Sequence, residues 1–113
     1  MRWLLLPLLL LAACSKGPEA DLPYISQARS LAAEWALINE QASQGKLTPT
    51  YIETMRKSVR EQLQTSAKAL SEPQSGYAKE IQAVLKEPDG ARPEDLRAHA
   101  ARLKQVEDGL ESA

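Results

Sequence analysis

Apolar residues recur along the chain at alternating steps of three and four, the spacing of one face of an α-helix. The first such stripe consists of Tyr24, Ala28, Leu31, Trp35, Ile38 and Ala42. It predicts a helix from Leu22 to Gln44, because Asp21 is a suitable N-cap and Gly45 a natural C-terminal stop.

A second stripe begins after Thr48 and Pro49, a hydroxyl cap and a proline that both suit the start of a helix. Its members are Ile52, Met55, Val59, Leu63, Ala67 and Leu70. Pro73 and Ser75-Gly76 end this helix, and a shorter one is predicted over Tyr77–Lys86.

A last helix is predicted from Pro93, after the turn Pro88-Asp89-Gly90. Its stripe is Leu96, His99, Leu103, Val106 and Leu110. No segment alternates apolar and polar residues for long enough to form a strand. The expected fold is therefore all-α: a small antiparallel helical bundle with a long two-helix hairpin, a shorter third helix and a C-terminal helix.

The chain begins MRWLLLPLLLLAACSKG, which has the pattern of an export signal. Its apolar run from Trp3 to Ala13 is eleven residues long, whereas a membrane-spanning helix needs about 20. Arg2 supplies the positive start and small residues close the run. The end of the run, Leu11-Ala12-Ala13-Cys14, resembles the lipobox of bacterial lipoproteins.

This resemblance implies cleavage between Ala13 and Cys14 and a covalent lipid on Cys14, with acyl chains such as palmitate. Cys14 is the only cysteine, so no disulfide can form within the chain. In lipoproteins of Gram-negative bacteria, a serine such as Ser15 after the cysteine implies the periplasmic face of the outer membrane. An ordinary secretory signal and inner-membrane retention remain alternatives.

The expected organisation has three parts: a signal peptide over residues 1–13 that is removed, a lipidated cysteine with a flexible tether over residues 14–22, and a helical domain over residues 23–113. Without Arg2, 13 basic side chains stand against 15 acidic ones. No basic excess indicates nucleic acid as a partner. Phenylalanine is absent and alanine is abundant, so we expect a thin core of modest stability.

His99 is the only histidine and occupies an apolar stripe. It has two interpretations: a metal ligand, base or pH sensor, or a half-buried histidine bonded to a neighbouring carboxylate or carbonyl. A zinc site would need further Cys, His or carboxylate ligands, and no serine has the context of a nucleophile. The sequence therefore predicts no catalytic residues, no metal site, no cofactor besides the lipid, and no enzymatic activity.

Four residues form a possible partner surface: Trp35, Arg56, Lys57 and Arg60. A tryptophan that the thin core leaves partly exposed would suit an interface. The basic residues could contact anionic groups, but Glu53 and Glu61 stand among them, so a plain mixed-charge face is the alternative.

The resulting functional hypothesis is a non-enzymatic, lipid-anchored envelope protein that binds another envelope protein as an accessory or adaptor. The rival is a module that holds a small amphipathic ligand in a pocket lined by Met55, Val59 and Trp35. The partner, the ligand and the oligomeric state are left open by the sequence.

Overall fold

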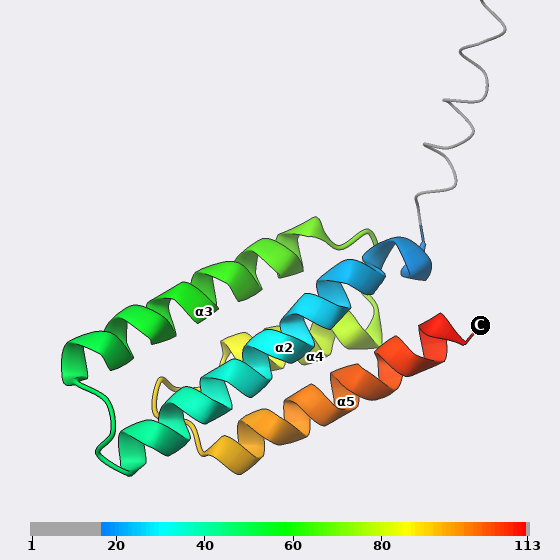
Figure 1. The fold of residues 1–113 in the computed structure, drawn as a ribbon. Helices are drawn as coiled ribbons and strands as arrows, with labels where there is room; N and C mark the ends of the chain where they lie inside the picture. The colour runs from blue at the N-terminus through cyan, green and yellow to red at the C-terminus, as the bar shows by residue number, and fades with distance from the viewer. Residues whose placement is uncertain (1–16, 113) are drawn as a thin grey trace, which may run out of the picture.

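The computed structural model describes residues 17–112, which form four α-helices and the short connections between them (Figure 1). They are α2 (Pro18–Ser43), α3 (Pro49–Ala69), α4 (Gly76–Leu85) and α5 (Pro93–Glu111), and these residues contain no strand. The predicted all-α helical bundle is confirmed. The predicted signal peptide, Cys14 and Ser15 lie outside the described residues.

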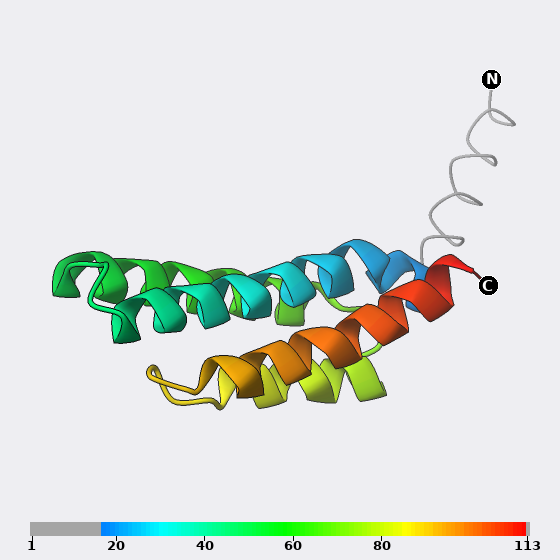
Figure 2. The same cartoon turned by 60° about the horizontal axis from the view of Figure 1, so that its bottom comes forward.

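The helices form two layers, with α2 beside α3 in one and α5 beside α4 in the other (Figure 2). Helix α2 packs against all three others, most extensively against α5 and α3. None of the helices in the described part of the chain is long and apolar enough to cross a membrane.

Helix α2 begins four residues earlier than the sequence predicts, at Pro18 instead of Leu22. Proline suits this first helical position because its missing N–H would have no partner there. The flexible tether predicted to extend to Leu22 is therefore wrong for residues 18–22. Asp21 is also not the N-cap: that position belongs to Gly17, and Asp21 lies inside the first turn.

Asp21 instead fastens α2 to the connection between α3 and α4. Its buried carboxylate accepts hydrogen bonds from the backbone N–H of Ser71 at 2.7 Å, the N–H of Glu72 at 3.1 Å and the Tyr77 hydroxyl at 2.6 Å. Burial opposes ionisation, but these donors outweigh it and hold the pKa of Asp21 below its usual value. The first turn of α2 is thus part of the folded body.

Stability at alkaline pH is expected to depend on Tyr77. Burial and the hydrogen bond to Asp21 raise the pKa of its hydroxyl to about 12 from 10.0, because a tyrosinate would be desolvated and would face a carboxylate. The group therefore contributes stability that is complete below pH 10 and is lost between about pH 10 and 12.

This loss can be measured by denaturant unfolding between pH 8 and 12, followed by circular dichroism. Tyr77→Phe lowers stability at pH 8 but should show a shallower decline above pH 10, and Tyr51→Phe, at an exposed position, is the matched control. Parallel declines for wild type and Tyr77→Phe would contradict the assignment.

The most extensive contact in the bundle is between α2 and α5. Arg29 pairs with Glu107 at 2.5 Å and Glu40 with Arg97 at 2.9 Å, so two ion pairs join the helices along their length. Small side chains recur every four residues along this part of α2 and leave room for a neighbouring helix: Ala28, Ala32 and Ala36, all fully buried. The abundance of alanine thus supports packing, although it limits the apolar volume of the core.

Candidate functional site

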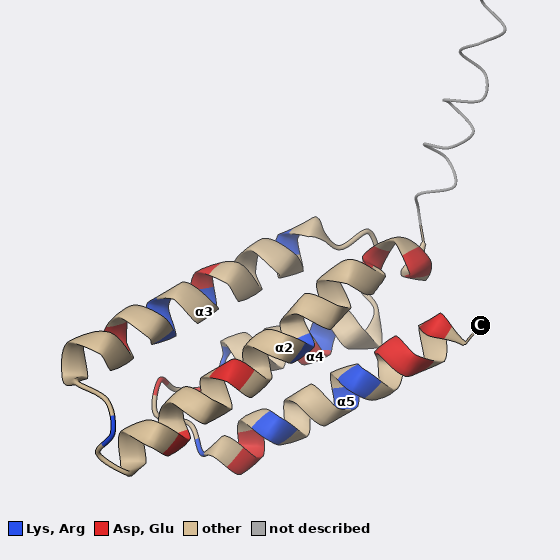
Figure 3. Cartoon of the chain, viewed as in Figure 1, with Lys and Arg blue, Asp and Glu red and all other residues tan. Residues whose placement is uncertain are grey.

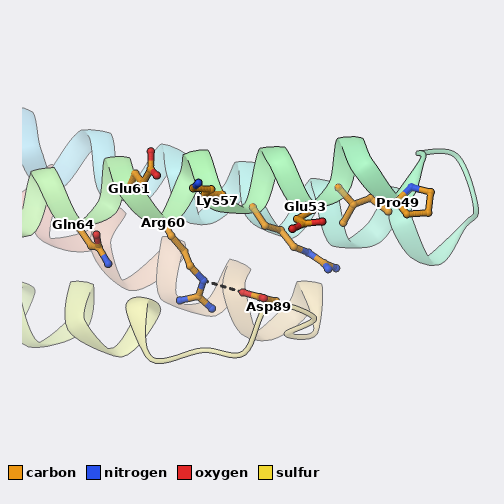
Figure 4. A pocket seen from close by; sticks show the side chains of 9 residues that line it. Pro49, Glu53, Lys57, Arg60, Glu61, Gln64 and Asp89 are labelled. Carbon is orange, nitrogen blue, oxygen red and sulfur yellow. Dashed lines mark hydrogen bonds and ion pairs between the residues drawn. The ribbon is translucent and has the colours of Figure 1, made fainter.

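A groove of about 680 Å³ runs along α3, on the side that faces the connection between α4 and α5. It is lined by Pro49, Ile52, Glu53, Arg56, Lys57, Arg60, Glu61 and Gln64 of α3 and by Asp89 of the connection between α4 and α5 (Figure 4). The groove thus covers four turns of one helix and is closed on the other side by a loop.

The groove exists because α4 is short. Helix α3 has 21 residues and α4 only 10, so α4 accompanies one half of α3 and the chain then crosses to α5 through residues 86–92. In Figures 1 and 2 the beginning of α3 extends past this loop. The first turns of α3 consequently have α2 beside them but no fourth helix.

Arg60 holds the loop against the bundle. Its guanidinium donates to the carbonyl oxygens of Leu85 at 2.8 Å and Glu87 at 2.5 Å, and to the Asp89 carboxylate at 2.9 Å. The same group lies 4.6 Å from the centre of the Trp35 ring, a cation–π distance. Arg60 is therefore engaged within the fold, and little of its charge is left for a partner.

Trp35 is fully buried, so the prediction that it contributes to an exposed partner surface is wrong. Its indole N–H donates to the backbone oxygen of Asp89 at 3.0 Å, and Arg60 covers the ring face. The thin core was expected to leave Trp35 partly exposed, but the loop after α4 and Arg60 cover it.

Arg56 is positioned by a neighbour that the sequence did not reveal as important. The amide of Asn39 on α2 donates to the carbonyls of Asp89 at 3.0 Å and Ala91 at 2.8 Å, which fixes its orientation. Its oxygen then accepts from Nε of Arg56 at 2.9 Å. Arg56 is half-buried in the groove with its guanidinium held from one side.

The three residues predicted to line a pocket between the two long helices do not line the groove. Trp35 and Val59 are fully buried in the core and Met55 is partly buried against it. The groove lies on a different side of α3, where Ile52 and Pro49 supply the apolar surface and Lys57 is exposed at the rim.

His99 occupies the second of its two predicted settings, a buried histidine bonded to carboxylates. Its Nδ1 contacts Glu80 of α4, and its Nε2 lies 2.7 Å from a Glu87 oxygen. Burial disfavours the charged form of Glu80, but hydrogen bonds from Arg102 and His99 prevail and lower the pKa of Glu80. Since both ring nitrogens of His99 have carboxylate partners, the imidazole links α5 to α4 and to the loop that follows α4.

Within residues 17–112, no three His, Cys, Asp or Glu side chains come together in an arrangement that could hold a metal ion. The prediction that the protein uses no metal or cofactor stays a prediction.

Sequence reasoning found the basic residues of α3 but missed Asn39 and Asp89, which position them. The only local signal was the turn Pro88-Asp89-Gly90, which marks a change of direction and says nothing about contacts with α2 and α3.

Comparison with known proteins gives no relative: no family model, no curated protein and no solved structure matches the chain.

Proposed function

We propose that this protein is a non-enzymatic, lipid-anchored accessory of the bacterial envelope that binds another envelope protein through the α3 groove. The observation that carries the proposal is the position of the groove. It opens where α4 no longer accompanies α3, toward the end of the bundle opposite Gly17. Peptide-binding surfaces of this kind accept an amphipathic helix along an exposed helical groove.

The short distance between Cys14 and the folded body supports this arrangement. Only Ser15 and Lys16 lie between Cys14 and Gly17, and the three steps from Cys14 to Gly17 span at most about 11 Å. A lipid on Cys14 would hold the start of α2 against the membrane. Helix α2 is about 39 Å long, so the groove would be presented away from the lipid surface.

The engagement of the candidate catalytic groups supports a non-enzymatic role. Both nitrogens of His99 have carboxylate partners, and the side chain is only 10% exposed. A general base needs a free nitrogen within hydrogen-bond reach of its substrate. Binding, rather than proton transfer, is the activity that the groove is suited for.

The anchor is tested by growing the bacterium with an alkyne analogue of palmitate and fractionating its envelope. Wild type is expected to carry the label and to remain with the membrane, whereas Cys14→Ser is expected to lose both properties. Ser15→Ala, one residue away, is the control that keeps the thiol. An unlabelled wild-type protein, or one whose mass still includes residues 1–13, would contradict the anchor.

A further inference from the structure

Arg56 differs from every other arginine in residues 17–112. The other five each pair with a carboxylate: Arg29, Arg60, Arg92, Arg97 and Arg102. Arg56 forms no ion pair among the described residues, and its one hydrogen bond goes from Nε to the neutral Asn39 amide. A half-buried guanidinium thus keeps its two terminal nitrogens for an acceptor outside the fold.

The position of Arg56 is fixed before any partner binds. Asn39 is buried and is itself bonded to two backbone carbonyls, so its oxygen cannot turn away from Arg56. A cation held in this way loses less conformational freedom on binding than one on a free surface side chain. Its planar fork suits a carboxylate, which it can bind through two parallel hydrogen bonds.

The rim of the groove carries an alternating charge pattern along α3, visible in Figure 3. Glu53, Lys57 and Glu61 follow one another at intervals of four residues, and none of them forms an ion pair within residues 17–112. Residues four apart lie on one face of a helix. A complementary helix would therefore carry an acidic residue near Lys57 and basic residues one turn to either side.

We infer that the groove receives an amphipathic helix of the partner protein, whose central carboxylate binds Arg56 and Lys57. An apolar side chain of that helix packs on Ile52, and basic residues one turn before and after the carboxylate face Glu53 and Glu61. The segment of α3 from Pro49 to Gln64 is about four turns long, so the partner helix continues the bundle where α4 stops. This inference rests on the proposed function and adds the chemistry of the partner.

The test uses the full-length protein in its native host, with a photo-crosslinking amino acid in place of Gln64 in the groove. The matched control carries it in place of Lys104 on α5, which is exposed and outside the groove. Mass spectrometry identifies the protein and the peptide joined at Gln64. Capture alone is not support; the captured peptide must contain an acidic residue within a helix-forming amphipathic segment.

The deciding step is a charge exchange between purified proteins. Arg56→Glu is expected to weaken the Kd at least tenfold, because a like charge replaces an attractive one, and exchange of the partner's acidic residue for arginine should restore most of the affinity. Arg56→Gln is a second variant, which removes the charge but keeps an N–H donor for Asn39. Circular dichroism checks that each variant is folded. Lys104→Glu is the control for net charge and should leave the Kd unchanged.

The outcomes separate the inference from the proposed function. A partner captured at Gln64 whose binding is unchanged by Arg56→Glu leaves the adaptor role standing and overturns the inference. Capture at Lys104 alone, or at neither position, overturns the proposed docking site and the inference with it. Capture of a second copy of this chain at Gln64, or Arg56-dependent binding of dodecanoate without any protein partner, would assign the groove to self-association or to a small ligand.

Discussion

Trp35→Ala is expected to cost about 3–5 kcal/mol of the free energy of unfolding. The side chain is fully buried, so its removal leaves a cavity in the core. It also leaves the backbone oxygen of Asp89 and the Arg60 guanidinium without the contacts they make with the indole. Domains of this size have about 5–15 kcal/mol of stability in total, so the variant is expected to be close to unfolding.

Urea unfolding followed by circular dichroism at 222 nm measures this effect, and the midpoint should fall by roughly 2 M or more. Trp35→Phe keeps most of the volume and loses the N–H donor, so its midpoint should lie between those of wild type and Trp35→Ala. Leu37→Ala is the control, because Leu37 is 48% exposed on the same helix. A midpoint for Trp35→Ala within experimental error of the Leu37→Ala value would show that the loop does not cover the tryptophan.

Asp21→Ala is expected to destabilise the domain by about 2–4 kcal/mol at pH 7. The substitution leaves three donors without the carboxylate that accepts from them: two backbone amides that follow α3 and the buried Tyr77 hydroxyl. Because this carboxylate joins residues 50 and more positions apart, its loss should free the start of α2 and the connection to α4 together. Amide hydrogen exchange at Ser71 and Glu72 should quicken accordingly.

The pH dependence gives Asp21 a second signature. Its pKa is lower in the folded state, so its contribution is present above about pH 4 and is lost as the pH falls through the lowered value. Wild type should therefore lose stability on acidification more steeply than Asp21→Ala. Glu19→Ala, an exposed acidic residue in the same helical turn, should behave like wild type. Equal acid slopes for wild type and Asp21→Ala would exclude a stabilising role for the carboxylate.

Local sequence signals predicted most of the helices correctly. Thr48 accepts from the N–H of Tyr51 at 3.2 Å and Pro49 opens α3, as the hydroxyl-proline pair predicted. Gly45 follows α2 with a positive φ of 70°, a conformation that glycine adopts without strain. Pro93 opens α5. These signals act within one or two turns of the chain, so they can be read from neighbouring residues.

The start of α2 could not be predicted in the same way. Local preference favoured Asp21 as the cap, and residues 14–22, Pro18 among them, were assigned to the tether. The choice of Pro18 depends on Ser71, Glu72 and Tyr77, which bind the Asp21 carboxylate from the other end of the hairpin. The neighbouring residues of Asp21 do not show that its carboxylate will bind these distant donors and will not cap the helix.

The sequence alone is enough to predict the all-helical class, the number of helices in the body and the apolar face of each, because these follow from a 3.6-residue period and from caps and turns. Which charged residues remain available to a partner depends instead on the packing of the helices and the loop. Residues 86–92 fold back over Trp35 and take up Arg60, while Asn39 holds Arg56 and supplies no charge to neutralise it. Such pairings join positions far apart in the chain, and their geometry exists only once the helices have packed.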